Sequence, residues 1–302
     1  MASPFSGEAF FVEDSMKIIK TVREMQGYSD LLRREEKVIA FVPTMGYLHE
    51  GHLDLMREGK KRGDCLVISI YVNPTQFAPG EDLEKYPRDF EYDERCARDV
   101  GVDVIFYPSD REIYPDGFQT YVTVEKVSNN LCGLSRPIFF RGVATICTKL
   151  FNIVNPHVTV FGKKDFQQLT VIKRMVGDLN MDIEVVGMPT TREPDGLAMS
   201  SRNAYLKDVE RESALSLSRS LKLAQGLYEE GERRASVIIE TVREYIGSHP
   251  SAKIDYVKIC DTGTMEDVET LEEESVLALA VWVGFPRLID NYVFGESLDI
   301  AG

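Results

Sequence analysis

An apolar run that breaks into a glycine turn and then a helical pattern is the feature that most restricts the fold of this chain. Residues 38–42 predict a buried strand, Pro43 and Gly46 predict a break, and residues 53–62 predict a helix. The first N–H groups of a helix lack internal partners, and the helix dipole is positive at that end. The junction therefore predicts a turn that binds phosphate.

The same alternation continues along the chain. Residues 65–72 form a continuous apolar, β-branched run, which is typical of a strand buried on both faces of a parallel sheet. We therefore expect a doubly wound, Rossmann-like α/β domain with ligands beyond the carboxyl ends of its strands. Its other predicted helices cover residues 15–34, 90–100, 141–154 and 166–179, and its other strands cover residues 103–107, 121–127, 157–161 and 183–186.

The pattern changes near Lys207, where two helical segments precede three strand-like runs. A chain of 302 residues is long for one simple domain, so one large and one small domain are expected. We predict a flexible extension at residues 1–14, a nucleotide-binding domain at 15–190, and a lid domain at 191–302. The lid would contain helices at 209–230 and 233–248 and a small antiparallel sheet of strands at 255–260, 276–283 and 287–294.

Charge and cysteine usage narrow the classes of function. The formal net charge of -14 disfavours nonspecific binding to nucleic acid or anionic membranes, so a few local Lys and Arg residues must hold any anionic substrate. The five cysteines are scattered without a CxxC pair, which argues against a disulfide framework or zinc cage and fits a reducing compartment. No run approaches the roughly 18 apolar residues of a membrane span, and no signal peptide is visible. We predict a cytoplasmic protein.

Two strand ends carry candidate phosphate ligands. His49 and His52 are three residues apart, so both imidazoles lie on one face of a first helical turn and can stabilise charge on a triphosphate. At a second junction, the charge of Lys164 adds to the helix dipole. In a parallel sheet both strand-to-helix junctions lie at the same edge. Lys164 can therefore face the nucleotide that His49 and His52 would bind. The alternatives are a satisfied surface pair or half a metal site for the histidines, and a solvated Lys164 beside Asp165 as N-cap.

Further polar residues follow the same logic. Gln168, one turn into the second helix, can hydrogen-bond a hydroxyl or carboxylate at that edge, and the residues after the 65–72 strand reach it too. A loop at 188–203 contains two prolines and a Ser200-Ser201-Arg202 step, whose donors can close over a triphosphate. The alternative is that a serine caps a helix and Arg202 is solvated.

Taken together, these segments resemble a known family. Pro43-Thr44-Met45-Gly46 with His49-Glu50-Gly51-His52 resembles the HxGH signature of nucleotidyltransferases in its pantothenate synthetase version. Met199-Ser200-Ser201-Arg202 is similar to a degenerate KMSKS loop. Phe139 stands where many bacterial members carry His and resembles plant members. Five further motifs match the family in order, at residues 71–77, 136–143, 161–169, 192–203 and 287–291.

The resemblance implies an activity and a set of site residues. Members activate pantoate with ATP and Mg²⁺ to pantoyl adenylate, releasing pyrophosphate, and β-alanine then displaces AMP; they are homodimers. His52 matches the proton donor, and Asp93 matches a position near the metal. Gln76 and Gln168 match pantoate-binding residues, and Gln76 also the β-alanine site. The implied ATP-binding residues are Met45, Gly46, Tyr47, Leu48, His49, Glu50, Gly51, His52, Gly162, Lys163, Lys164, Asp165, Thr191, Met199, Ser200, Ser201 and Arg202, with His49, His52, Lys164, Ser200, Ser201 and Arg202 acting in catalysis.

Other functions remain open from the residues alone. A different HxGH adenylyltransferase, acting on a phosphorylated acceptor, would want a basic acceptor pocket in place of Gln76 and Gln168. A tRNA synthetase would need an anticodon-binding domain and a basic face. A regulatory nucleotide-binding module would be expected to have lost one member of the set His49, His52, Lys164 and Arg202.

Overall fold

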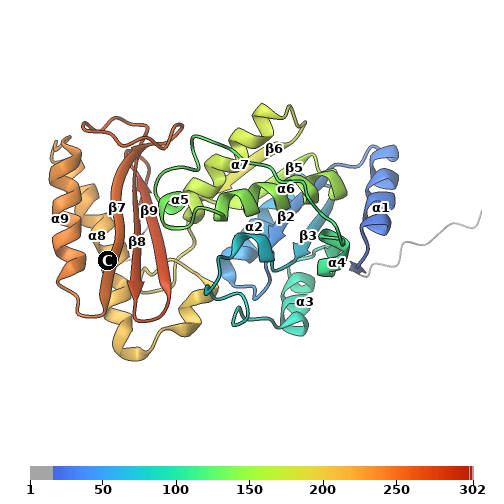
Figure 1. Cartoon of the computed structure of the whole chain (residues 1–302), viewed down its shortest axis with the longest axis horizontal. Helices are drawn as coiled ribbons and strands as arrows, with labels where there is room; N and C mark the ends of the chain where they lie inside the picture. The colour runs from blue at the N-terminus through green and yellow to red at the C-terminus, as the bar shows by residue number, and fades with distance from the viewer. Residues whose placement is uncertain (1–15, 299, 301–302) are drawn as a thin grey trace, which may run out of the picture.

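Two sheets organise the computed structural model, which describes residues 16–298 and 300 (Figure 1). Six parallel strands form the first sheet in the order β1-β4-β3-β2-β5-β6, and three antiparallel strands form the second in the order β7-β8-β9. The predicted fold class is therefore confirmed. The extension predicted at residues 1–14 lies outside the described residues. The strands are β1 (Lys17–Ile19), β2 (Ile39–Thr44), β3 (Cys65–Ile70), β4 (Val104–Phe106), β5 (Val158–Gly162), β6 (Glu184–Met188), β7 (Ala252–Asp261), β8 (Ser275–Val283) and β9 (Arg287–Val293).

Helices cover both faces of the parallel sheet. Alternate strand residues enter opposite cores, so that Ile39 and Phe41 pack in one cluster while Ala40 and Val42 pack in the other. The first cluster is closed by α1 (Val22–Arg34), α6 (Phe139–Val154) and α7 (Phe166–Asp178), and the second by α2 (Glu50–Arg62) and α3 (Phe90–Asp99). Both faces are buried, which explains the continuous apolar runs.

The strand order reverses between β2 and β5, and the two strands separate there. They pair only through Ala40 with Val158 and Phe41 with Thr159, although β2 continues to Thr44 and β5 to Gly162. Pro43 lies beyond this pairing, so its missing N–H group removes no hydrogen bond to β5. The separation opens a crevice at the topological switch point, where doubly wound sheets bind ligands.

Two predicted elements are wrong. The helix predicted at 15–34 is β1 followed by α1, because Ile18 pairs with Ile105 of β4 and the Thr21 side chain caps α1 by accepting the Glu24 N–H. The strand predicted at 121–127 is irregular. Val122 donates its N–H to the Thr145 hydroxyl and packs on the core, so the alternating apolar pattern reflects burial and not strand pairing.

The second sheet packs its inner face on two helices, α8 (Asp208–Glu229) and α9 (Ala235–Gly247). Figure 1 shows these helices on the outer side and β9 on the side of the parallel sheet. The boundary predicted at residues 190 and 191 and the lid role stay predictions. No helix among residues 16–298 is both long enough and apolar enough to cross a membrane.

Candidate active site

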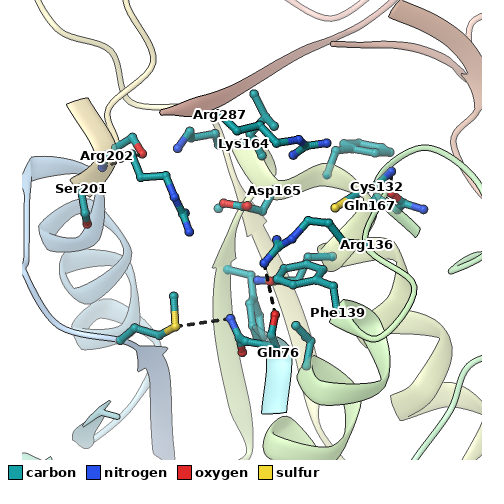
Figure 2. A pocket seen from close by; sticks show the side chains of 18 of the residues that line it. Gln76, Cys132, Arg136, Phe139, Lys164, Asp165, Gln167, Ser201, Arg202 and Arg287 are labelled. Atoms are coloured by element: carbon teal, nitrogen blue, oxygen red, sulfur yellow. Dashed lines mark hydrogen bonds between the residues drawn. The ribbon is translucent and has the colours of Figure 1, made fainter. Parts of the chain in front are cut away.

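A cavity of about 860 Å³ lies at the crevice between β2 and β5 and extends to β9. Residues from both sheet units line it. Figure 2 shows Gln76 on one side of the cavity and Lys164 and Arg202 on another. The strand ends that sequence patterns selected therefore converge on one space, as parallel topology requires.

The turn after β2 is built on a glycine and a buried carboxylate. Gly46 has a φ of +79°, and a Cβ at this position would lie 2.7 Å from Oδ2 of Asp93. The two oxygens of Asp93 accept the backbone N–H groups of Tyr47 at 2.8 Å and Leu48 at 2.7 Å. Burial raises the pKa of Asp93, and these two N–H groups act in the opposite direction. Asp93 on α3 thus holds the shape of the turn.

The two histidines occupy the start of α2. His49 is its N-cap residue, and the ring centroids of His49 and His52 are 4.0 Å apart. His52 Nδ1 accepts the His49 backbone N–H at 3.3 Å, which assigns the proton of a neutral ring to Nε2. Burial, with the charge of Lys164, lowers the pKa of His49 to about 4, and burial lowers the pKa of His52 well below its usual value. Both rings are neutral donors near pH 7.

The turn after β5 separates its two lysines. Lys164 lines the cavity, and burial lowers the pKa of its ammonium group. Lys163 is directed elsewhere, because its Nζ pairs with Glu296 at 2.6 Å. This short 3₁₀ turn, η2 (Lys163–Asp165), leads directly into α7. Gln168, in the first turn of α7, and its neighbour Gln167 both line the cavity, but the Gln167 amide is hydrogen-bonded to the backbone of residues 127–132.

The amide of Gln76 is oriented by its neighbours. Its Oε1 accepts from Asn73 Nδ2 at 3.0 Å, and its Nε2 is directed to Met45 Sδ at 3.3 Å. Asn73 also donates to the carbonyl of Gly142. A Cβ on Gly142 would lie 2.5 Å from the Thr75 carbonyl oxygen, so this glycine allows α6 to pack against the η1 turn (Pro74–Gln76).

The loop after β6 brings hydroxyl groups and a cation to the cavity. Ser200 caps η3 (Ser201–Tyr205) by accepting the Arg202 N–H, and Ser201 donates to the Tyr47 carbonyl at 3.3 Å. Thr191 donates to Asp54 of α2 at 2.8 Å. Arg202 pairs with Asp82 at 3.1 Å, so its guanidinium already forms an ion pair with an acidic residue that lines the cavity.

A second arginine of the wall was not predicted as a site residue. Arg136 forms two bonds to Glu81, at 2.7 and 2.6 Å, and lies over the Phe139 ring at 4.0 Å. Although burial opposes it, the Arg136 guanidinium lowers the pKa of Glu81. Phe139 supplies an apolar face here, with no polar group. Residues 136–143 belong to one of the motifs that match the family, and this match was the sequence signal that could have identified Arg136 as a site residue.

Several predicted ATP-binding residues do not line the cavity. Glu50 is exposed and pairs with Arg57, while Lys163 pairs with Glu296. Gly46, Tyr47 and Leu48 form the turn that Asp93 holds, and their binding of ATP stays a prediction. The predicted residues that do line it are Met45, His49, Gly51, His52, Gln76, Gly162, Lys164, Asp165, Gln168, Thr191, Met199, Ser200, Ser201 and Arg202.

The predicted metal role of Asp93 does not fit its surroundings. Both of its oxygens accept backbone N–H groups, and it does not line the cavity. Within the described part of the chain, no group of three or more His, Cys, Asp or Glu side chains is arranged to hold a metal ion. Among these same residues, His49 and His52 have no third side chain of this kind placed to complete a metal site with them.

Comparisons with known proteins show the family of this chain. A family model described as pantoate-beta-alanine ligase matches residues 17–293. A pantothenate synthetase of Syntrophus aciditrophicus is 68% identical over 94% of this chain and 100% of its own length, and one of Geobacter sulfurreducens is 58% identical over 93% and 100%. The crystal structure of pantothenate synthetase from Thermus thermophilus has a TM-score of 0.87 at 40% identity, covering 92% of this chain and 99% of its own. The likeness of Phe139 to plant members stays a prediction.

A ligand-bound structure is also similar. The pantoate-beta-alanine ligase of Francisella tularensis, complexed with beta-gamma ATP and beta-alanine, has a TM-score of 0.78 at 30% identity, over 94% of this chain and 100% of that one.

Proposed function

This chain belongs to the pantoate–β-alanine ligase family, and we propose that it joins its substrates through a pantoyl adenylate. It is an ATP-dependent ligase that forms pantothenate from pantoate and β-alanine. One observation carries the assignment of the site. At the switch point, the neutral His49 and His52 and the ammonium group of Lys164 line the same cavity as Gln76 and Gln168. Hydrogen-bond donors suited to a triphosphate therefore lie next to donors suited to a hydroxy acid.

In the first step, a pantoate carboxylate oxygen attacks the α-phosphorus of ATP. A phosphorus–oxygen bond forms to pantoate, the bond to the β-phosphate bridging oxygen breaks, and pyrophosphate leaves. This transfer needs positioning and charge neutralisation more than a strong base. His49, His52 and Lys164 would supply these from one side, and Ser200, Ser201 and Arg202 from the loop. The hydrogen bond at His52 Nδ1 supports Nε2–H as the donor to a phosphate oxygen.

In the second step, the amine of β-alanine attacks the acyl carbon. A carbon–nitrogen bond forms, the acyl carbon–oxygen bond to phosphate breaks, AMP leaves with the bonding electrons, and the amine loses a proton. Gln76 and Gln168 suit pantoate because a neutral amide binds hydroxyl and carboxylate groups without a second buried charge. The contact between Gln76 Nε2 and Met45 supports an amide donor facing the cavity. β-Alanine would then bind near Gln76.

The proposal extends to Mg²⁺, to the oligomeric state and to the location of the protein in the cell. Mg²⁺ would arrive with the triphosphate, since Mg²⁺ is commonly held by substrate phosphates, waters and few carboxylates. It would screen phosphate charge, and no step here depends on a protein cage for it. A cytoplasmic homodimer follows from the resemblance, and the five free cysteines fit a reducing compartment.

The test is exchange of labelled pyrophosphate into ATP with pantoate and Mg²⁺ present and β-alanine left out. Exchange that requires pantoate is the expected result. Without β-alanine the reaction stops after the first step, and the reverse of that step incorporates labelled pyrophosphate into ATP. A folded protein that binds ATP, forms pantothenate with all substrates, and shows no exchange would overturn the adenylate route.

A further inference from the structure

Strand β9 carries two neighbouring buried polar residues, Asp290 and Asn291. Their exposed fractions are 2% and 8%. Burying polar side chains costs free energy unless they are hydrogen-bonded, and two apolar residues would have served the core of this sheet better. The partners of the pair therefore indicate why β9 contains them.

Asn291 holds the turn that carries Lys164. Its Nδ2 donates to the carbonyl oxygens of Lys163 and Lys164, both at 2.9 Å. One planar amide thus binds two consecutive backbone carbonyls, which restricts both the position and the direction of η2. Asn291 is on the antiparallel sheet and η2 ends a strand of the parallel sheet, so the contact joins the two units of the chain.

The turn has little local support of its own. Gly162 precedes η2 and Asp165 precedes α7, and neither provides a side-chain cap. The Lys164 side chain has no ion pair or side-chain hydrogen bond to the described residues. Its position in the cavity therefore depends on where the backbone of η2 is held.

Asp290 holds the opposite segment in a similar way. Its two carboxylate oxygens accept hydrogen bonds from the Arg192 guanidinium at 2.7 and 3.0 Å, and this ion pair is buried. Arg192 follows Thr191 directly and bridges to Ala198, next to Met199, so this ion pair anchors the loop that leads to Ser200 and Arg202. Adjacent residues of one strand therefore hold two of the segments proposed to bind the triphosphate.

We propose that Asn291 is a positioning residue for Lys164, and that β9 sets the separation between Lys164 and the loop at residues 191–202. The inference rests on the proposed function of Lys164 at the triphosphate. A displacement of about 1 Å in a reacting site can cost about 100-fold in rate. Asn291 also lines the cavity, but its amide is occupied by the two backbone carbonyl groups, so its loss should weaken the use of ATP by releasing Lys164.

The experiment compares Asn291→Leu with the wild type by pantoate-dependent pyrophosphate exchange. Asn291→Leu keeps approximate size and removes both donors, and we expect kcat/KM for ATP to fall about 10- to 100-fold, with a higher KM for ATP. Glu296→Gln is the matched control, because it removes the other tie to η2, the Lys163–Glu296 ion pair, at an exposed position. The control should retain the wild-type KM for ATP.

A double-mutant cycle separates positioning from general damage. In a Lys164→Ala background, Asn291→Leu should cause little further loss, because the group it positions is absent. An unchanged KM for ATP in Asn291→Leu, or equal losses in both backgrounds, would overturn the proposal. A protein that only folds less well loses active fraction and keeps its KM.

A second variant guards against failure to fold. Asn291→Asp keeps the shape, but its carboxylate cannot donate to the two carbonyl groups, so it should reproduce the rise in KM for ATP. A normal KM in that variant would also overturn the proposal. Wild-type exchange in the same assay tests the adenylate route separately, so failure of the proposed function is distinguishable from failure of this inference.

Discussion

The Nδ1 atom of His52 accepts the backbone N–H of His49 at 3.3 Å, so the start of α2 orients the second imidazole. The same bond leaves Nε2 to carry the proton of the neutral ring. Helix geometry thus supplies a directed donor beside the unpaired N–H groups of the helix, without requiring a charged imidazole.

His52→Ala should lower the rate of pyrophosphate exchange by roughly 100- to 1000-fold, because a donor to developing charge is removed. Steady-state exchange at saturating ATP and pantoate measures this. His249→Ala is the control, since His249 lies beyond α9 and outside the cavity. Unchanged turnover in His52→Ala would exclude this residue from the mechanism.

Stability should fall as the pH decreases from about 6.5 to about 4. Burial lowers the pKa of His49 to about 4 in the folded chain, whereas the pKa of an unfolded histidine stays at its ordinary value of 6.5. Between these values the unfolded state binds a proton that the folded state does not, so unfolding is favoured at lower pH. Urea unfolding at several pH values should show a smaller fall for His49→Gln. Equal pH dependence in both proteins would contradict the lowered pKa.

Gln76→Ala should raise the KM for pantoate by about tenfold or more while changing the KM for ATP much less, because a buried amide contact to pantoate is lost. Initial rates with each substrate varied in turn give both values. Gln225→Ala, on the surface of α8, is the control. Equal weakening of both substrates would place Gln76 outside the pantoate site.

Lys164→Ala should reduce kcat/KM for ATP by about 10- to 100-fold at every pantoate concentration, since a charge-assisted contact to the triphosphate is removed. Exchange rates across an ATP series measure this. Lys173→Ala provides the control from an exposed position on α7. Normal kinetic constants in Lys164→Ala would support the solvated alternative.

Asp82→Asn should lower the KM for ATP by up to about fivefold. Asp82 pairs with Arg202 at 3.1 Å, and a partly exposed pair of this kind contributes up to about 1 kcal/mol that a triphosphate must displace. Titration with ATP at constant ionic strength checks the change. A higher KM would mean that Asp82 helps to bind the nucleotide and does not compete with it.

Local patterns predicted most of the α/β elements and failed where pairing decided the outcome. β1 is three residues long and forms because Ile18 pairs with Ile105 of β4. No local sequence pattern encodes this pairing. Residues 121–127 have an apolar pattern that is equally compatible with packing on α6. Both errors arise because strand formation depends on a partner that is distant in sequence.

The chemistry of the candidate site could be predicted where it depends on spacing within one turn. His49 and His52 share a helical turn, and the ends of β2 and β5 must open on one edge of a parallel sheet, so both histidines and Lys164 converge. Arg136, Asp82 and Glu81 could not be assigned this way, because an ordinary surface charge and a buried partner look alike in sequence.

The sequence by itself therefore determined the fold class, the carboxyl-end edge of the sheet as the place of the site, and the family, since these follow from periodicity and from motifs at strand ends. Only the tertiary structure decided which of two adjacent lysines enters the cavity, that Asp93 supports a turn, and that Asn291 holds η2. Arg202 and Asp82 are 120 residues apart, and Asn291 is 128 residues from Lys163. The physical reason is that such contacts arise from the packing of the two sheet units, which is not encoded in the local sequence.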